Sequence, residues 1–425
     1  MSLWDKSAGS VPIEPSQVVV GLYVWLDLSW TEHPFVTNRF LVKTQKDVHI
    51  IQSLDLSGRL YYHPDKSEQA LPPKAAAVAD ASDEAQIQTK QALIEEVRRL
   101  EKAKKDKIWE QKDAAARAAR AWDSAASGIR DALVNLSGSP KTAGVQFKQL
   151  SAETAATVAQ GKDMLLHLQG DSGTQGPQFH ALNTMTLCLM LGKKAGLNER
   201  ELADLAMAAL AHDAGKSEVP LHILKNTQRK KHEEEFYRQH VHYSVQLASL
   251  SGAFSPSALA IIADHHETLD GKGWPQQKTN LGPGARILGL VDRYDRLCSP
   301  EAPGKEPMMP AEALARLFRQ ESSKYDATLL ALLIKLLGVY PPGTVVQLND
   351  GSLALVVAPG SQSLQPKVLI YSPELSKDDA PVLELATEAE LKIVSAVRPS
   401  TLAPEVMAWL NPQQRLSYYF TVSDT

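Results

Sequence analysis

The sequence has little cysteine and no dominant charge, and both shortages narrow what the chain can be. Only two cysteines, Cys188 and Cys298, occur among 425 residues. Their spacing fits neither a disulfide framework nor a cysteine-rich zinc site, so a reducing cytoplasm is the simplest expected location. The formal net charge of −4 gives no global electrostatic reason to expect DNA, RNA or an anionic membrane as a partner.

Long apolar runs are lacking as well. None approaches the roughly 18–20 residues that a bilayer-spanning helix needs, and the longest candidate, 329–337, is interrupted by Lys335. The N-terminus lacks a basic segment followed by an apolar one, so no signal peptide is expected. With 44% hydrophobic and 22% charged residues, the composition is typical of a globular protein. The length favours two or three domains.

The two ends of the chain are expected to be small β-rich modules, at 1–66 and 341–425. The first contains runs rich in β-branched and aromatic residues, which predict strands at 18–26, 40–43 and 48–51. The second follows a break at Pro341-Pro342-Gly343. Its two apolar runs flank Asn349-Asp350-Gly351, which is a hairpin signal.

The middle of the chain is expected to be helical. In a linker at 67–140, Leu93, Val97 and Leu100 fall at helical spacing, and acidic residues interleave with basic ones. That mixture favours a solvent-exposed helix over a nucleic-acid patch, and such a helix could also form a homodimer. In 141–340, apolar residues recur at steps of three and four. The predicted fold is therefore multidomain and mainly α, with a central helical bundle.

Histidine is concentrated in the predicted bundle. Nine of the 12 histidines lie between His167 and His266, and several stand beside carboxylates or each other at the ends of apolar helices. Burying such groups is costly unless they are paired or coordinated. Mixed imidazole and carboxylate ligands suit iron, manganese, zinc or nickel better than calcium. The pattern predicts a divalent-metal site, and a pair of ions about 3.5–4 Å apart is a known solution for displacement at phosphorus.

Two motifs provide most of this signal. The first is His212-Asp213-Ala214-Gly215-Lys216, in which the carboxylate could bridge two cations and the lysine could meet a phosphate. The second runs from His265 to Pro275 and contains Asp270-Gly271-Lys272-Gly273-Trp274. Its glycines allow close backbone approach, and Trp274 could stack on a base or pack on the protein.

These motifs resemble those of the HD-GYP subgroup of the HD phosphohydrolase superfamily, His-Asp-x-Gly-Lys and His-His-Glu-x-x-Asp-Gly-x-Gly-Tyr-Pro. The resemblance covers roughly residues 165–340. The preceding unit looks like the uncharacterised domain often found ahead of bacterial HD-GYP domains. The resemblance implies an HD-type helical bundle and a metal-dependent phosphodiesterase, which hydrolyses the bacterial second messenger cyclic di-GMP to pGpG or GMP with metal-activated water.

Two other functions stay open. One is a catalytically weak cyclic di-GMP-binding signalling module that interacts with diguanylate cyclases of the GGDEF type. The other is hydrolysis of a different phosphate ester, such as another cyclic dinucleotide or a nucleotide monophosphate.

By position, the resemblance also implies roles for individual residues. The ligands of two divalent ions would be His180, His212, Asp213, His240, His265, His266 and Asp292, with Asp213 bridging. Asp213 and Lys216 would be catalytic. Substrate contacts would come from Lys216, Asp270, Gly271, Gly273, Trp274 and Arg286.

The chain departs from the family pattern at four places. Trp274 replaces the motif tyrosine. Gly176 stands four residues before His180, where members with three metals carry a glutamate, which favours two ions here. Residues 225–231 replace the usual Lys-Pro-Gly stretch, and residues 300–305 stand where Arg-Pro-Tyr-Arg is common. All of the expected metal ligands are nevertheless present.

Overall fold

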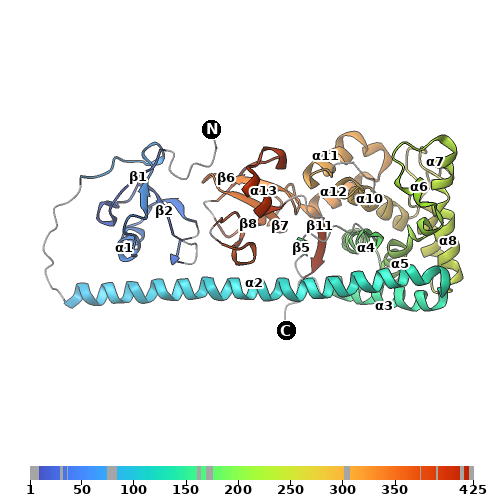
Figure 1. Ribbon diagram of the computed structural model, residues 1–425, viewed down its shortest axis with the longest axis horizontal. Helices are drawn as coiled ribbons and strands as arrows, with labels where there is room; N and C mark the ends of the chain where they lie inside the picture. Colours follow the sequence, from blue (N-terminus) through green and yellow to red (C-terminus); the bar gives the residue numbers. More distant parts are fainter. Residues whose placement is uncertain are drawn as a thin grey trace.

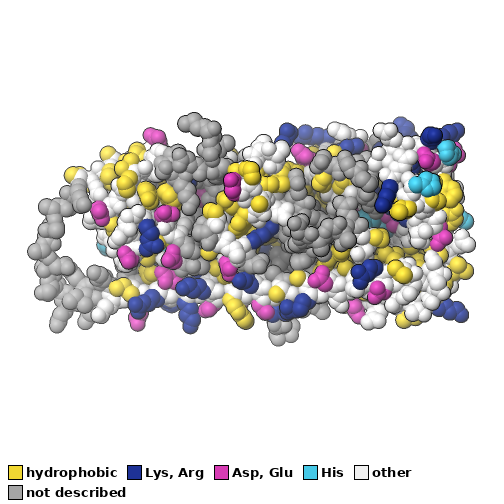
Figure 2. All heavy atoms as spheres, viewed as in Figure 1, with side chains coloured by type: hydrophobic (Ala, Val, Ile, Leu, Met, Phe, Trp, Pro, Cys, Tyr) yellow, Lys and Arg dark blue, Asp and Glu magenta, His cyan; other side chains and the backbone are white. Residues whose placement is uncertain are grey.

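A single long helix, α2 (Glu84–Gly138), organises the molecule. Its 55 residues correspond to about 80 Å at the usual helical rise. Figure 1, a computed structural model, shows two small sheets and a helical bundle arranged side by side along it. The residues described are 9–28, 32–35, 37–73, 84–159, 164–168, 176–300, 307–373, 375–388, 391–411 and 416–420. On the face seen in Figure 2, basic and acidic side chains are interspersed along α2, as expected for a solvent-exposed helix surface.

The N-terminal part is an antiparallel sheet with one helix. The strand order is β1 (Val11–Pro12), β4 (Leu60–Tyr62), β2 (Tyr23–Leu26) and β3 (Arg39–Leu41). The prediction of a strand at 48–51 is wrong, because these residues belong to helix α1 (Gln45–Ser53). Thr44 and Asp47 form a capping box that starts the helix. Val48 and Ile51, three residues apart, then bury one helix face against the sheet.

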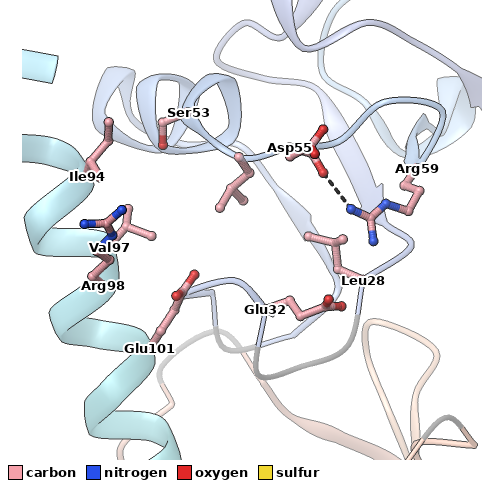
Figure 3. A pocket seen from close by; sticks show the side chains of 10 residues that line it. Leu28, Glu32, Ser53, Asp55, Arg59, Ile94, Val97, Arg98 and Glu101 are labelled. Atoms are coloured by element: carbon pink, nitrogen blue, oxygen red, sulfur yellow. Dashed lines mark hydrogen bonds between the residues drawn. The ribbon is translucent and has the colours of Figure 1, made fainter. Parts of the chain in front are cut away.

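A cavity of about 300 Å³ lies between this part and α2 (Figure 3). Leu28, Leu54 and Val97 give it an aliphatic wall, and charged side chains of both signs surround that wall. On the N-terminal side, the Arg59 guanidinium donates to the backbone carbonyl of Asp55 at 2.8 Å. The N-terminal sheet therefore meets α2 at a hollowed, mixed-charge surface.

The C-terminal part is a five-stranded antiparallel sheet. Its order is β10 (Ile393–Ala396), β6 (Val345–Leu348), β7 (Leu353–Gln362), β8 (Gln365–Ile370) and β9 (Val382–Glu384). β6 and β7 form the hairpin predicted around Asn349-Asp350-Gly351.

Both faces of this sheet are buried, because alternate residues of a strand point to opposite sides. Val346 packs in a cluster with Ile108 of α2, whereas its neighbour Val345 packs in another cluster with Val406 and Leu410. The last two belong to helix α13 (Pro404–Leu410). The sheet is thus held between α2 and α13.

The helical bundle contains the largest core. Its main helices are α4 (Pro177–Lys194), α5 (Glu199–Ala211), α8 (His240–Leu250), α9 (Pro256–Asp264), α10 (Pro283–Cys298), α11 (Pro310–Gln320) and α12 (Ala327–Leu337). The end of α2 and α3 (Pro140–Ala159) pack on the same core. There Trp122 of α2 stacks on Phe179 of α4 with ring centroids 5.0 Å apart.

Two shorter helices, α6 (Leu221–Lys225) and α7 (Lys231–Arg238), precede α8. Strands β5 (Met164–Leu168) and β11 (Leu416–Phe420) pair with each other. The architecture confirms the predicted multidomain, mainly α fold with small β modules. Within the described part of the chain, no helix combines the length and the apolar character needed to cross a bilayer.

Glu321 joins α10 to the end of α11, and its substitution should destabilise the bundle. It accepts hydrogen bonds from Arg293 at 2.9 and 2.7 Å and from Arg316 at 2.9 Å. Burial raises the pKa of Glu321, but these arginines outweigh it and lower the pKa from 4.5 to about 2. Since the folded-state pKa is depressed, the stabilisation is present above pH 4.5 and is lost as the pH falls towards 2.

We expect Glu321→Gln to lower the free energy of unfolding by about 2 kcal/mol at pH 7. The difference from wild type should shrink at pH 3, as measured by urea unfolding at both pH values. Glu312→Gln is a matched control, because Glu312 is half-exposed on α11 and lies 3.7 Å from an exposed arginine. An equal loss at the two pH values would contradict the ion-pair explanation.

Candidate metal centre

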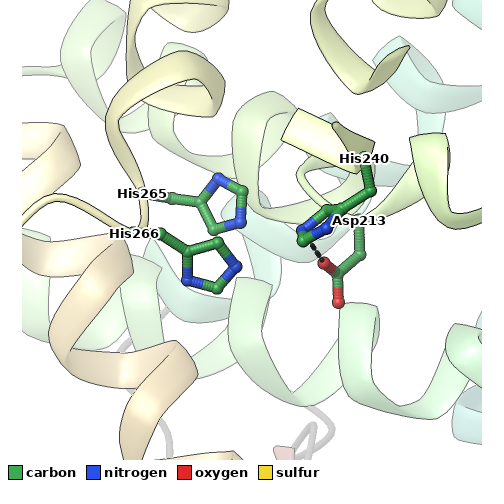
Figure 4. A group of neighbouring side chains, drawn as sticks. All are labelled: Asp213, His240, His265 and His266. Atoms are coloured by element: carbon green, nitrogen blue, oxygen red, sulfur yellow. Dashed lines mark ion pairs between the residues drawn. The ribbon is translucent and has the colours of Figure 1, made fainter. Parts of the chain in front are cut away.

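The seven side chains predicted as metal ligands lie together in the bundle, most of them at or near helix ends and Asp292 in the middle of α10. They form two groups of four, and in each group the potential ligand atoms lie within 4.8 Å of one another. The first group is Asp213, His240, His265 and His266 (Figure 4). The second group is His180, His212, Asp213 and Asp292. Asp213 belongs to both groups, which is the position expected of a bridging carboxylate.

The end of α5 explains how adjacent His212 and Asp213 serve one centre. His212 is the C-cap of α5, and Asp213 leaves the helix for the 3-10 turn η4 (Ala214–Glu218). Consecutive residues within a helix point about 100° apart, and the change of backbone direction removes that restriction. Gly215 makes the packing possible, because a Cβ there would lie 2.2 Å from the carbonyl oxygen of His240.

Backbone carbonyls orient three of the imidazoles. The Nδ1 atoms of His212, His240 and His265 each contact the carbonyl oxygen three residues earlier, at 2.8, 2.7 and 2.7 Å. A hydrogen bond from Nδ1–H fixes the tautomer and leaves the Nε2 lone pair free to bind a cation. The local helix ends therefore prepare these side chains as ligands.

In the first group, the inward-facing atoms are of the kinds that bind a cation. The Nε2 atoms of His240, His265 and His266 and the Oδ1 atom of Asp213 are buried without a hydrogen-bond partner. Burial lowers the pKa of His265 to about 3 and that of His266 well below its usual value, so both rings are neutral. An unsatisfied buried polar atom costs about 1–3 kcal/mol. A divalent cation would satisfy all four, so these residues fit one.

The second group is linked internally. His180 Nε2 lies 3.0 Å from Asp292 Oδ1 and 3.1 Å from His212 Nε2. On the other side of the ring, His180 Nδ1 lies 2.7 Å from Asp295 Oδ2. Asn183 donates to the second oxygen of Asp295 at 3.2 Å. Burial lowers the pKa of His180, but the hydrogen bonds to Asp292 and Asp295 outweigh it and raise the pKa to about 9.

Two basic side chains neutralise the carboxylates. Lys216 donates to Asp213 Oδ2 at 2.8 Å. The Arg296 guanidinium donates to the same oxygen and, through Nε, to Asp292 Oδ1 at 2.7 Å. Burial alone would raise the pKa of both carboxyl groups, but the nearby cations hold it well below the usual range. Both carboxylates are therefore ionised.

Sequence reasoning missed the roles of Asp295 and Arg296. A weak signal existed, because residues three and four positions after Asp292 lie on the same face of a helix. Only the packing of α4 on α10 shows that this face meets His180.

The residues predicted to contact substrate lie in different surroundings. Lys216 borders the centre, as described above. The Trp274 ring stacks on that of His266, with centroids 4.1 Å apart, and meets the His240 ring edge-on, with centroids 5.4 Å apart. Trp274 therefore packs on the protein, and its stacking on a base stays a prediction. The indole covers two of the predicted ligands.

The remaining predicted substrate residues shape the loop or lie beside another helix. Asp270 accepts from Thr268 Oγ1 at 2.6 Å, and Gly271 has a positive φ of 68°. A Cβ at Gly273 would lie 2.4 Å from a backbone nitrogen. Arg286 donates to the carbonyl of residue 281 and pairs with Asp326 at 3.2 Å, at the start of α12. These contacts direct its guanidinium to α12.

Two family models match the chain. The HD domain model matches residues 154–329, and the model of a domain of unknown function, DUF3391, matches residues 10–142. Cyclic di-GMP phosphodiesterase PA4108 of Pseudomonas aeruginosa is 26% identical over 406 residues, which are 91% of this chain and 92% of the relative. The chain is an HD-GYP-type protein. Its HD match contains both ligand groups, and its DUF3391 match includes the N-terminal sheet and α2.

This HD-GYP-type protein is also similar, over shorter stretches, to two relatives named as phosphodiesterases. Cyclic di-GMP phosphodiesterase PdeB of Borreliella burgdorferi is 29% identical over 180 residues, 42% of this chain and 47% of the relative. The 3'3'-cGAMP-specific phosphodiesterase 2 of Vibrio cholerae is 28% identical over 152 residues, 35% of this chain and 29% of the relative. The chain thus spans less than half the length of these two relatives. Proteins with different cyclic dinucleotide substrates share this similarity.

Proposed function

We propose that this HD-GYP-type protein is a metal-dependent phosphodiesterase that hydrolyses cyclic di-GMP to pGpG or GMP. The observation that carries the proposal is the sharing of Asp213 by two groups of ligand-type side chains. The similarity to PA4108 over most of both chains supports cyclic di-GMP as the substrate. It also favours an enzyme over a signalling module without turnover.

The two groups would each hold one divalent ion, with Asp213 between them. Their imidazole and carboxylate ligands suit iron, manganese, zinc or nickel. Ions in these positions would lower the pKa of a bound water and neutralise phosphate oxygens.

The chain's own residues would then orient the substrate. Lys216 would pair with a non-bridging phosphate oxygen, which is supported by the 2.8 Å between its ammonium and the shared carboxylate. Trp274 has His266 on its ring, and Arg238 lies 5.5 Å from its centroid. We therefore assign Trp274 to holding His266 in place, with the loop formed by Asp270, Gly271 and Gly273 as a wall of the pocket.

The test is hydrolysis by purified full-length protein, with products separated by chromatography. With Mn²⁺ or Fe²⁺, the protein should produce pGpG or GMP from cyclic di-GMP. After removal of metal by a chelator it should produce neither, and added metal should restore the activity. Tight cyclic di-GMP binding without product after long incubation would contradict the proposal and select the signalling-module alternative.

A substrate panel should include 3'3'-cGAMP and a nucleotide monophosphate. Faster cleavage of either than of cyclic di-GMP would overturn the substrate assignment and leave the reaction class in place.

As protein partners we propose diguanylate cyclases of the GGDEF type and a second copy of this chain. Pairing of two copies through α2 is supported by its exposed apolar side chains, of which Trp109 is 68% and Val134 73% exposed. Light scattering of the wild type and of Trp109→Gln would test the homodimer, because an unchanged mass in the variant would contradict pairing through this surface.

A further inference from the structure

Arg296 contacts the same two oxygens that the second ligand group would offer to a cation. These are Oδ2 of Asp213 and Oδ1 of Asp292. His180 Nε2 lies 3.6 and 3.0 Å from them, and His212 Nε2 lies 3.5 and 3.4 Å from them. The guanidinium is therefore bonded to both carboxylate ligand atoms of the group, one helical turn after Asp292 on α10.

The first ligand group differs at the corresponding carboxylate oxygen. Asp213 turns its other oxygen, Oδ1, to that group, where it lies 3.4 Å from His240 Nε2 without a hydrogen-bond partner. The two oxygens of the Asp213 carboxylate therefore differ in their contacts. Oδ1 faces the histidines of the first group and accepts no hydrogen bond, whereas Oδ2 accepts hydrogen bonds from Arg296 and Lys216.

We propose that Arg296 is an internal cation that competes with the metal ion of the second group, so that the two ions bind with unequal affinity. The inference rests on the proposed function and concerns regulation of the same centre by metal supply. The guanidinium is permanently charged and fits carboxylates well. An ion entering the group must break two charge-assisted hydrogen bonds and approach a like charge.

The position of Arg296 allows its side chain to leave the carboxylates when an ion binds. Its side chain is 17% exposed, whereas that of Asp292 is 5% exposed, so Arg296 is the more solvent-accessible member of the pair. At low metal concentration the first group would be filled while Arg296 still neutralises the second. Full loading, and with it hydrolysis, would then depend on the free metal concentration.

Metal binding tests the proposal without any substrate. Full-length protein stripped with a chelator is titrated with Mn²⁺, and free Mn²⁺ is counted by electron paramagnetic resonance. The wild type should bind two ions, the second more weakly. Arg296→Gln, which removes the charge, should raise the affinity for the second ion by about tenfold and leave the affinity for the first ion unchanged. Arg296→Lys, which keeps the charge, should stay close to wild type.

Two further variants make the result specific. Arg293→Gln is a matched control, because Arg293 lies on the same helix and pairs with Glu321 instead, so it should leave both affinities unchanged. Arg296→Met is a second neutral variant that keeps the aliphatic stem and should behave as Arg296→Gln does. Thermal unfolding checks that each variant is folded.

If the neutral variants bound the second ion with unchanged or lower affinity, the proposal that Arg296 competes with that ion would be overturned. In that case, metal-dependent hydrolysis by the wild type would leave the proposed function intact. A wild type that neither binds Mn²⁺ nor hydrolyses cyclic di-GMP would instead overturn the proposed function, and this inference with it.

Discussion

Replacing Asp213 with asparagine should disrupt both proposed ion sites at once. We expect hydrolysis of cyclic di-GMP to fall at least about a thousandfold, or about 4 kcal/mol of transition-state stabilisation. The reason is geometric, because one oxygen of Asp213 faces His240 at 3.4 Å and the other faces His180 and His212 at 3.6 and 3.5 Å. A neutral amide provides one oxygen and no charge, so it cannot serve two cations. Initial rates and bound metal per chain measure the effect.

Asp264→Asn is the matched control for this substitution. Asp264 immediately precedes His265 but belongs to neither ligand group. Its carboxylate instead accepts a hydrogen bond from Lys278 Nζ at 2.7 Å. Rates and metal content should stay near wild type. If Asp213→Asn lost only one ion, Asp213 would not be shared by the two sites. Full activity in Asp213→Asn would contradict the proposed mechanism.

The parts of the centre that lie in adjacent residues could be predicted from the sequence. His212-Asp213 and His265-His266 follow apolar helical stretches, and burying such polar pairs needs an explanation. His180 and His240 have no such neighbours, and only the family resemblance pointed to them. The structure places them on α4 and at the first position of α8.

Contacts between distant segments could not be predicted. His180 and Asp295 are 115 positions apart, and their hydrogen bond depends on how α4 packs on α10. The same applies to β5 and β11, which pair across most of the chain. β5 lies in the stretch 141–340 that was expected to be helical.

The error at 48–51 has a local cause. A short apolar run fits a strand or a buried helix segment equally well by periodicity. The deciding features are side-chain hydrogen bonds at the start of the helix, where Thr44 and Asp47 satisfy each other's backbone groups. β-branched residues such as Val48 and Ile51 favour strands only weakly, so the cap and the burial of one face outweigh them.

Asp295→Asn should weaken the ion of the second group by about 10- to 100-fold and lower hydrolysis at limiting metal in proportion. Asp295 is 2% exposed and fixes His180 through Nδ1. A carboxylate in this position accepts from Nδ1–H and keeps Nε2 available as a ligand, whereas an amide can donate to Nδ1 and place the proton on Nε2. Mn²⁺ titration should show the first ion bound as in wild type and the second weakened.

Asn183→Ala is the control, because it removes the donor to the other oxygen of Asp295, at 3.2 Å, and leaves the carboxylate that contacts His180 in place. It should cost less affinity than Asp295→Asn. Asp295 and Arg296 are neighbours on α10, yet their neutral variants should change the affinity for the second ion in opposite directions. General damage to α10 would weaken the ion in both. Weakening with Asp295→Asn and tightening with Arg296→Gln would therefore separate a residue that orients a ligand from one that competes with the metal.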